Sequence, residues 1–330
     1  MKSIKIFALA IAPIMSLSMM GQKLTFQSPV ASMSASSPGG VIGRPSVSGV
    51  YFTAAGSSGP SVYGVTSQGG TPQHVLTYIN GGGANQQFSN LSNPLYNGAT
   101  IASTSTPGLT AMNGYLYLAF ADVLGNSYII SSQDGINWTG PTINVSNGLP
   151  AGTQYNPSLT SDPSTGTIYA AYADGTTHTP IVCSWVPGNN PTCHSYTSLR
   201  TENFNPGIAF YDGLVYLGYA DRGDNHCLYF YKYTPSTAAM TNWMPLGCSQ
   251  QTSSGPSLAV YNNYLYIAYR SNDSSIKFTV EVSTDGNTIN TANRMQPGFA
   301  VDGYPSLVNV GSALMGIYSR SNYLTTTLGN

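Results

Sequence analysis

The chain has 330 residues, of which 7% are Asp, Glu, Lys or Arg, and its formal net charge at pH 7 is −1. So sparse and balanced a charge gives it no electrostatic means of holding nucleic acid or an anionic membrane surface, and we expect neither as a partner. Its 24 tyrosines argue against disorder. The length suits one large all-β domain or two ordinary ones.

The first residues have the features of an export signal. Two lysines precede an apolar run from Ile6 to Met15, and small residues follow it. The run is too short to span a membrane, and no later segment is apolar enough to cross a bilayer. We therefore expect residues 1–21 to be a signal peptide cleaved between Ser18 and Gly21, which makes the protein secreted, periplasmic or exposed at the cell surface. An uncleaved anchor is the alternative.

One sequence phrase recurs along the chain at a fixed spacing. Each copy begins with Pro, then Gly or Ser, then Leu or Ile, and an aromatic-rich run follows after a tight turn. This pattern predicts two short strands joined by a turn in every copy. Successive starting prolines are 50, 49, 50 and 49 residues apart: Pro107, Pro157, Pro206, Pro256 and Pro305. A constant period near 50 is typical of a repeat architecture.

Repeats of this length with four short strands match the blades of a β-propeller. A degenerate first copy begins at Arg44 and is lengthened by a Gly- and Asn-rich insertion over residues 80–100. We therefore predict an all-β protein with a propeller of six four-stranded blades over residues 41–330. Five or seven blades are the alternatives, because the first copy matches the others poorly. A β-solenoid is the alternative fold.

The last copy has room for only three strands before Asn330. A propeller must close its ring, and a strand from the other terminus can complete the last blade. The segment Leu24 to Gln27 is predicted to be that strand, and the Ser-, Pro- and Gly-rich residues 28–40 a linker. Residues 22–40 are thus interpreted as a closing strand with its linker.

Four cysteines in an exported chain predict two disulfides. Cys183 and Cys193 flank a turn-rich stretch, and Cys227 and Cys248 lie at the two ends of another strand–turn–strand stretch. We predict these two local pairs; free buried thiols are the alternative. The spacing does not resemble a metal site, so no metal or other cofactor is expected, and no motif supports calcium.

The second copy contains Ser132-Gln-Asp134-Gly135-Ile-Asn-Trp138, which resembles the Asp-box, or BNR repeat, of the sialidase superfamily. A partial match at Ser283-Thr-Asp285-Gly286 lacks the aromatic residue. In that family the box forms the hairpin between the third and fourth strands of a blade, so the resemblance implies a propeller. The Asp accepts backbone N–H bonds, the Gly adopts positive φ and the Trp packs back onto the blade. The motif is therefore interpreted as structural.

The blade assignment gathers most charged residues on one face of the ring. This face, where each first strand begins and each second strand ends, is called the mouth face; the opposite face, which carries the first and third turns, is called the turn face. Loops on one face of a rigid scaffold commonly carry binding sites. Arg294 is assigned to a mouth-face connector. The predicted ligand-binding residues are Arg44, Glu202, Arg222, Arg270, Asp174 and Asp221. The alternative is that these charges only solvate the loops.

The sialidase resemblance also implies three arginines on a substrate carboxylate, a Tyr–Glu nucleophile pair and an Asp acid. The matching positions are Arg44, Arg222 and Arg270 for the carboxylate, and Glu202 with Tyr318 for the nucleophile. However, no Asp or Glu lies between Arg44 and Asp122, so the first blade cannot supply the acid. The missing leaving-group protonation is worth roughly 10²–10⁴-fold in rate. This favours a non-catalytic protein.

The sequence thus predicts a secreted, lectin-like propeller that binds a glycan or glycoconjugate without cleaving it. Exposed Tyr and Trp rings can stack on sugars, while Asn, Asp and Arg side chains bond the hydroxyl groups. An exo-acting glycoside hydrolase of sialidase type is the first alternative, and a propeller that binds proteins at a surface is the second.

Overall fold

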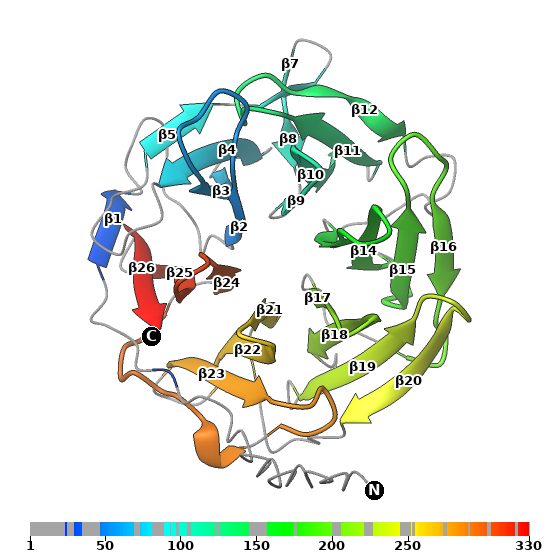
Figure 1. Ribbon diagram of the computed structural model, residues 1–330, viewed down its shortest axis with the longest axis vertical. Coiled ribbons are helices and arrows are strands. Elements are labelled where there is room, and N and C mark those ends of the chain that lie inside the picture. Colours follow the sequence, from blue (N-terminus) through cyan, green and yellow to red (C-terminus); the bar gives the residue numbers. More distant parts are fainter. Residues whose placement is uncertain are drawn as a thin grey trace, which may run out of the picture.

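The computed structural model describes residues 24, 30–34, 47–68, 73–80, 89–92, 94–96, 99–103, 107–122, 124, 126–144, 157–174, 177–199, 206–220, 227–244, 252, 255–272, 276–289, 291–301, 305–320 and 323–329. In these residues, six antiparallel sheets of three or more strands stand around a common axis (Figure 1). Their innermost strands lie side by side in one closed ring, in the order β2, β9, β13, β17, β21, β24 and back to β2. The predicted six-bladed propeller is confirmed.

Each blade is an antiparallel meander that runs outward from the axis. Blade one holds β2 (Val47–Phe52), β3 (Ser61–Gln68), β4 (Gln73–Asn80) and β5 (Ser89–Ser92), with β8 (Ala102–Ser103) also pairing with β4. Blade two holds β9 (Gly108–Met112), β10 (Tyr115–Ala121), β11 (Ser127–Ser132) and β12 (Thr139–Asn144). Blade three holds β13 (Ser158–Asp162), β14 (Thr167–Ala173), β15 (Pro180–Trp185) and β16 (Thr192–Ser195).

The second half of the ring is less regular. Blade four holds β17 (Gly207–Tyr211), β18 (Leu214–Ala220), β19 (Leu228–Thr234) and β20 (Ala239–Met244). Blade five holds β21 (Ser257–Tyr261), β22 (Tyr264–Arg270) and β23 (Phe278–Ser283). Blade six holds β24 (Ser306–Asn309), β25 (Leu314–Arg320), β26 (Tyr323–Gly329) and, outermost, β1 (Val30–Ser34). A separate ribbon pairs β6 (Leu95–Tyr96) with β7 (Ala99–Thr100).

The ring closes through the N-terminus as predicted, but through a different segment. The closing strand is β1, residues 30–34, which lies within the stretch interpreted as linker. Leu24 lies outside any strand and is buried in the core between blades five and six, while residues 25–27 lie outside the described part of the chain. Leu24 was predicted to be a strand residue because it is apolar. Its side chain is instead buried in the core.

Blade five departs from the predicted four strands. Its fourth position is taken by the segment 291–301, which begins with the 3₁₀ turn η3 (Thr291–Asn293). The backbone of this segment pairs with residues 277 and 280 through isolated bridges instead of a continuous ladder. Met295 bridges Val280, and Phe278 N–H donates to the Phe299 carbonyl. This irregular outer edge brings Arg294 to the rim of the ring, with consequences for the site described below.

The core lies between neighbouring blades, because side chains alternate along each strand. On β22, for example, Ile267 and Tyr269 belong to the cluster shared with blade four, whereas Tyr266 and Ala268 belong to the cluster shared with blade six. Both faces of a middle strand are therefore buried. This explains why the second strand of each repeat is almost continuously apolar.

The inner strands present one unpaired edge to the axis, and neighbouring blades satisfy it with hydroxyl groups. Ser48 Oγ accepts the Leu109 N–H (3.0 Å), and Ser257 Oγ accepts the Leu307 N–H (2.9 Å). A serine hydroxyl near the start of an inner strand thus joins blade to blade. Where the repeat carries Gly108 instead, the blades approach more closely, and a Cβ on that glycine would lie 2.0 Å from the Pro157 carbonyl oxygen.

The Ser132–Trp138 turn has the geometry expected of its residues. Gly135 adopts φ 75°, and its N–H donates to Ser132 Oγ (2.8 Å). Trp138 Nε1 donates to the Gly135 carbonyl (3.0 Å), and Asp134 Oδ1 accepts the N–H groups of Ile136 and Asn137 (2.8 Å each). The turn joins β11 to β12, so it lies between the third and fourth strands as the resemblance implied.

This turn also docks onto the preceding blade, because the Ala55 N–H of blade one donates to the Gln133 carbonyl (2.9 Å). The partial match in blade five does the same. Asp285 Oδ1 accepts the Asn287 and Thr288 N–H groups, and Gly286 lies against Tyr216 of blade four. The two turns therefore have a structural role at blade junctions.

Stability should depend on pH through Asp134. Partial burial would raise its pKa, but hydrogen bonds from the Asn137 and Ile136 backbone and from the Asn137 and Ser132 side chains outweigh this and lower the pKa to about 2. A lowered folded-state pKa stabilises the fold above pH 4, and this contribution disappears as the pH falls from about 4 to about 2. After allowance for solvent screening we expect roughly 1 kcal/mol.

Denaturant unfolding at pH 6 and at pH 2.5 checks this expectation. Asp134→Asn should lose about that 1 kcal/mol at pH 6 and little at pH 2.5. An equal difference between the two proteins at both pH values would show that the charge of Asp134 does not stabilise the turn.

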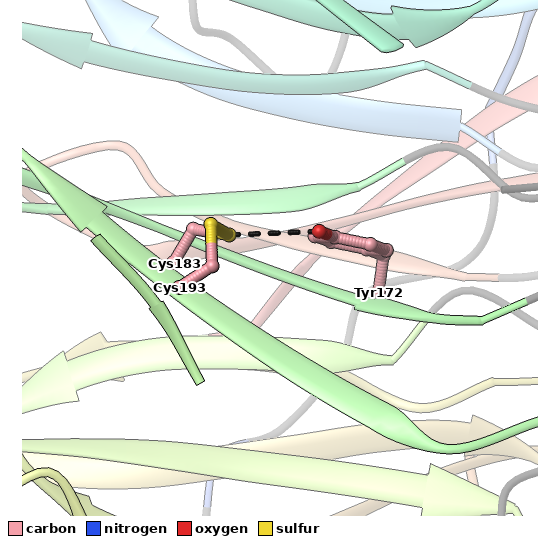
Figure 2. The surroundings of a disulfide bond; sticks show 3 residues. All are labelled: Tyr172, Cys183 and Cys193. Carbon is pink, nitrogen blue, oxygen red and sulfur yellow. Dashed lines mark hydrogen bonds between the residues drawn. A yellow bond between two sulfur atoms is a disulfide. The ribbon is translucent and has the colours of Figure 1, made fainter. Parts of the chain in front are cut away.

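The predicted disulfide between Cys183 and Cys193 is formed (Figure 2). The two residues face each other directly on β15 and β16, with Cα atoms 4.0 Å apart, and the Tyr172 hydroxyl lies 3.6 Å from Cys183 Sγ. Cys227 is also disulfide-bonded. Its predicted partner, Cys248, lies outside the described residues. Within the described chain, no helix is long and apolar enough to cross a bilayer.

Candidate functional site

At the axis, the six inner strands begin around a cavity of about 100 Å³. Its lining consists of Pro, Gly, Ser, Leu and Ile residues of the recurring phrase, and none of the described lining residues is charged. Ligand pockets usually exceed about 300 Å³, whereas this volume suits roughly three water molecules. Among the described residues, the axial cavity is therefore smaller than a typical ligand pocket and offers no charged side chain.

Two of the predicted ligand-binding residues are described, and both take part in local bonds. Asp174 Oδ1 accepts the N–H (2.6 Å) and Oγ1–H (2.8 Å) of Thr177, which fixes the loop after β14. Arg270 ends β22, and its Nε donates to the Val301 carbonyl (3.0 Å). The two lie in blades three and five, with blade four between them. The other predicted residues, Arg44, Glu202, Asp221 and Arg222, lie outside the described residues.

Tyr318 does not suit the nucleophile role that the sialidase resemblance implied. Its side chain is 0% exposed on β25, and its ring stacks on Phe278 (centroids 5.4 Å apart) and Phe299 (5.1 Å). A glycoside cannot reach a hydroxyl in this position without displacement of the core. The residue is part of the packing between blades five and six.

The structure instead reveals a buried carboxylate that the sequence analysis overlooked. Glu281, in the middle of β23, is 1% exposed. Its Oε1 accepts the hydroxyl of Tyr269 (2.8 Å) and forms an ion pair with Arg294 Nε (3.0 Å). Its Oε2 is buried and has no hydrogen-bond partner among the described residues. Tyr269, Glu281 and Arg294 are called the Glu281 cluster below.

The other blades show that the fold does not require this charge. In blade five, Ile267 on the second strand pairs with Glu281, and Tyr269 follows two residues later. Phe120, Tyr172 and Tyr219 occupy the position of Tyr269 on the second strands of blades two, three and four. The third-strand residues equivalent to Glu281 are Tyr78, Ile130, Cys183, Tyr231 and Thr327. All five are uncharged. Because burial of a carboxylate is costly, its presence in one blade alone needs a reason other than the fold.

Arg294 carries the cluster to the protein surface. It was predicted to lie in a mouth-face connector, but the segment 291–301 runs along the outer edge of blade five, so the prediction was wrong. About 31% of its side chain is exposed. The ion pair uses Nε, and guanidinium groups have four further N–H donors on the two terminal nitrogens. Glu281 therefore binds Nε of an arginine whose side chain is partly exposed.

Neighbouring side chains extend the polar surface beside Arg294. Gln296, two residues further along the same segment, is exposed and donates from Nε2 to Thr279 Oγ1 (3.1 Å). On the side of blade four, Trp243 belongs to the same core cluster as Tyr269. Its Nε1 is buried and has no hydrogen-bond partner in the described part of the chain. The outer edge of blade five thus carries a guanidinium held by Glu281 and an exposed amide, whereas the Trp243 ring, 7% exposed, belongs to the core of the junction.

This arrangement suits binding better than acid–base chemistry. Glycoside hydrolysis generally uses two carboxyl groups on either side of the scissile bond, and Glu281 is one buried carboxylate engaged by two donors. In the described residues, no group of three or more His, Cys, Asp and Glu could hold a metal ion. A guanidinium held in one orientation can make paired hydrogen bonds to vicinal hydroxyl groups or to a carboxylate.

Comparison with known proteins places the chain by fold rather than by sequence. No protein-family model matches it. No curated protein sequence matches it either.

Several solved structures share the fold. The fungal lectin of Aleuria aurantia, described as a six-bladed β-propeller with a novel fucose recognition mode, is 12% identical with a TM-score of 0.62, and the match covers 88% of this chain and 93% of the lectin. A protein of unknown function from Dyadobacter fermentans is 11% identical, with a TM-score of 0.68 and coverage of 93% and 99%.

A third similar structure is a neuraminidase-like protein of an isolate from a flat-faced bat from Peru. It is 14% identical to this chain, with a TM-score of 0.55 and coverage of 93% and 94%. At such low sequence identity, the similarity is one of architecture alone. The protein is therefore a β-propeller whose architecture is similar to that of a fucose lectin and of a neuraminidase-like protein.

Proposed function

We propose that the protein is a secreted, lectin-like propeller that binds a glycan and does not cleave it. The observation that carries the proposal is the Glu281 cluster, in which a buried carboxylate holds a partly exposed arginine at a blade junction. A fixed guanidinium loses little side-chain entropy when it bonds sugar hydroxyls, so a preorganised arginine strengthens binding. The disulfide fits an oxidising, extracytoplasmic location.

The similar structures support a glycan as the ligand, because one is described with fucose recognition and another as neuraminidase-like. The non-catalytic part of the proposal rests on this chain. Blade one lacks any Asp or Glu before Asp122, and Tyr318 is buried. The mouth-face residues Arg44, Glu202, Arg222, Asp221, Asp174 and Arg270 are proposed as a second contact surface for a larger glycan.

Glycan-array binding tests the proposal with variants at the rim of blade five. Arg294→Ala should weaken binding of the best glycan about 10- to 100-fold, since a hydrogen bond to a charged group is worth roughly 1.5–3 kcal/mol. Gln296→Ala, which removes an exposed amide without unpairing Glu281, should weaken binding severalfold. Lys277→Ala removes a half-buried cation of the same blade and should bind as the wild type does.

The array separates the alternatives. If no glycan binds the wild type, the protein-binding alternative replaces the proposal. If glycans bind equally well to wild type, Arg294→Ala and Gln296→Ala, the site lies elsewhere. Loss of binding in Arg270→Ala alone would place it on the mouth face.

A further inference from the structure

The N-terminal segment is attached to the ring at two separate points. Leu24 is 3% exposed in the core cluster between blades five and six. Six residues later, β1 pairs antiparallel with β26 as the outermost strand of blade six, where Figure 1 shows it beside the C-terminal strand. Both contacts are made by residues that precede the propeller repeats in the sequence.

The β1 contact is the weaker of the two strand pairings made by β26. It consists of Val30↔Thr326, Ala31↔Thr325, Met33↔Leu324 and Ser34↔Tyr323, with a register irregularity between Ala31 and Met33. By contrast, β25 pairs with β26 continuously over seven residue pairs, from Leu314↔Gly329 to Arg320↔Tyr323. A short, irregular edge strand with one neighbour opens at a lower free energy than the strands inside a blade.

Among the described residues, the Leu24 contact has no counterpart at the other junctions. Every other residue of the six core clusters comes from the repeat sequence, between Val50 and Tyr318. Leu24 joins the cluster that contains the stacked rings of Phe278, Phe299 and Tyr318, whose centroids are 5.1–5.6 Å apart. The last junction of the ring therefore takes one apolar side chain from outside the repeats.

We infer that Leu24 and β1 (Val30–Ser34) together act as a detachable latch on the ring. Leu24 is its anchor, β1 is its arm, and the two dock and undock together while blades one to five stay folded. Undocking exposes the backbone edge of β26 and the position that Leu24 occupied. A ligand that fits both would add a strand to the edge of β26 and place an apolar side chain, six residues earlier in its sequence, where Leu24 was. The same segment from a second copy of the chain has this spacing.

Hydrogen exchange of the full chain, read by mass spectrometry, tests the latch. Leu24→Ala should speed the exchange of amides in 30–34 and 323–329 at least tenfold, with less than twofold change in blades two to four. Leu258→Ala removes a comparably buried leucine from the junction of blades four and five and serves as the control. It should leave 30–34 and 323–329 unchanged. Uniform acceleration in Leu24→Ala, or no change in 323–329, would overturn the inference.

A peptide of residues 22–36, added to the Leu24→Ala protein, tests whether the position can be refilled. The wild-type peptide should restore protection of 323–329 by at least fivefold, whereas a peptide carrying Leu24→Asp should not. If neither peptide protects 323–329, the segment docks only as part of its own chain and the latch is not detachable.

Discussion

Arg294→Ala should lower the free energy of unfolding by roughly 3 kcal/mol, a large effect for a residue on the rim. The change removes the cationic partner of Glu281, whose carboxylate is 1% exposed and whose Oε2 has no hydrogen-bond partner among the described residues. Removal of one member of a buried ion pair typically costs about 3–5 kcal/mol, because an uncompensated charge stays buried. We expect the lower end, since part of Arg294 is exposed.

A double variant distinguishes the loss of the partner from the loss of packing. In Arg294→Ala/Glu281→Gln the buried group is neutral and can still accept the Tyr269 hydroxyl, so at least half of the lost stability should return. Denaturant unfolding at pH 7 measures both proteins. If the double variant is as unstable as Arg294→Ala, the stem of the arginine stabilises the junction by packing, and the charge of Glu281 is not what Arg294 compensates.

Gly108→Ala should cost about 3 kcal/mol, the upper end of what overpacking costs. A Cβ at this position would lie 2.0 Å from the Pro157 carbonyl oxygen and 3.2 Å from Ser158 Cα. Both atoms belong to the backbone where blade three begins, so no side-chain rotation can relieve the contact. The two blades would have to separate at the axis, where the ring is most closely packed.

Gly59→Ala is the matched control, because a Cβ there would meet no atom within 4 Å and the residue has no positive φ. It should change stability by no more than about 0.5 kcal/mol. Equal melting temperatures for Gly108→Ala and Gly59→Ala would contradict the close approach of blades two and three.

Much of the fold follows from the sequence because the repeat is physically constrained. The recurring Pro directly precedes five of the six inner strands. The second strand is apolar on both faces because neighbouring blades cover both of its sides. The turn around Asp134 is equally predictable, since its bonds form within a few residues. The disulfide Cys183–Cys193 follows from the short loop that it closes.

The closing strand and the site were harder to predict for a shared reason. The position of β1 depends on its pairing with the C-terminal strand β26, and the position of Arg294 depends on an irregular edge of blade five. Neither pairing leaves a periodic signal in the sequence. Leu24 is apolar because it fills a junction, and a single apolar residue does not distinguish a strand from an anchor. Glu281 did leave a signal: alignment of the six repeats on one another shows one acid at a position where the other five are uncharged.

Isothermal titration calorimetry with the best glycan from the array tests whether the protein binds a glycan without cleaving it. We expect a saturable heat signal that returns to baseline after each injection, with the glycan recovered intact and the signal strongly reduced in Arg294→Ala. Sustained thermal power after each injection, from continuing hydrolysis, would contradict the non-catalytic reading. No heat of binding at any temperature tried would contradict the lectin-like function itself.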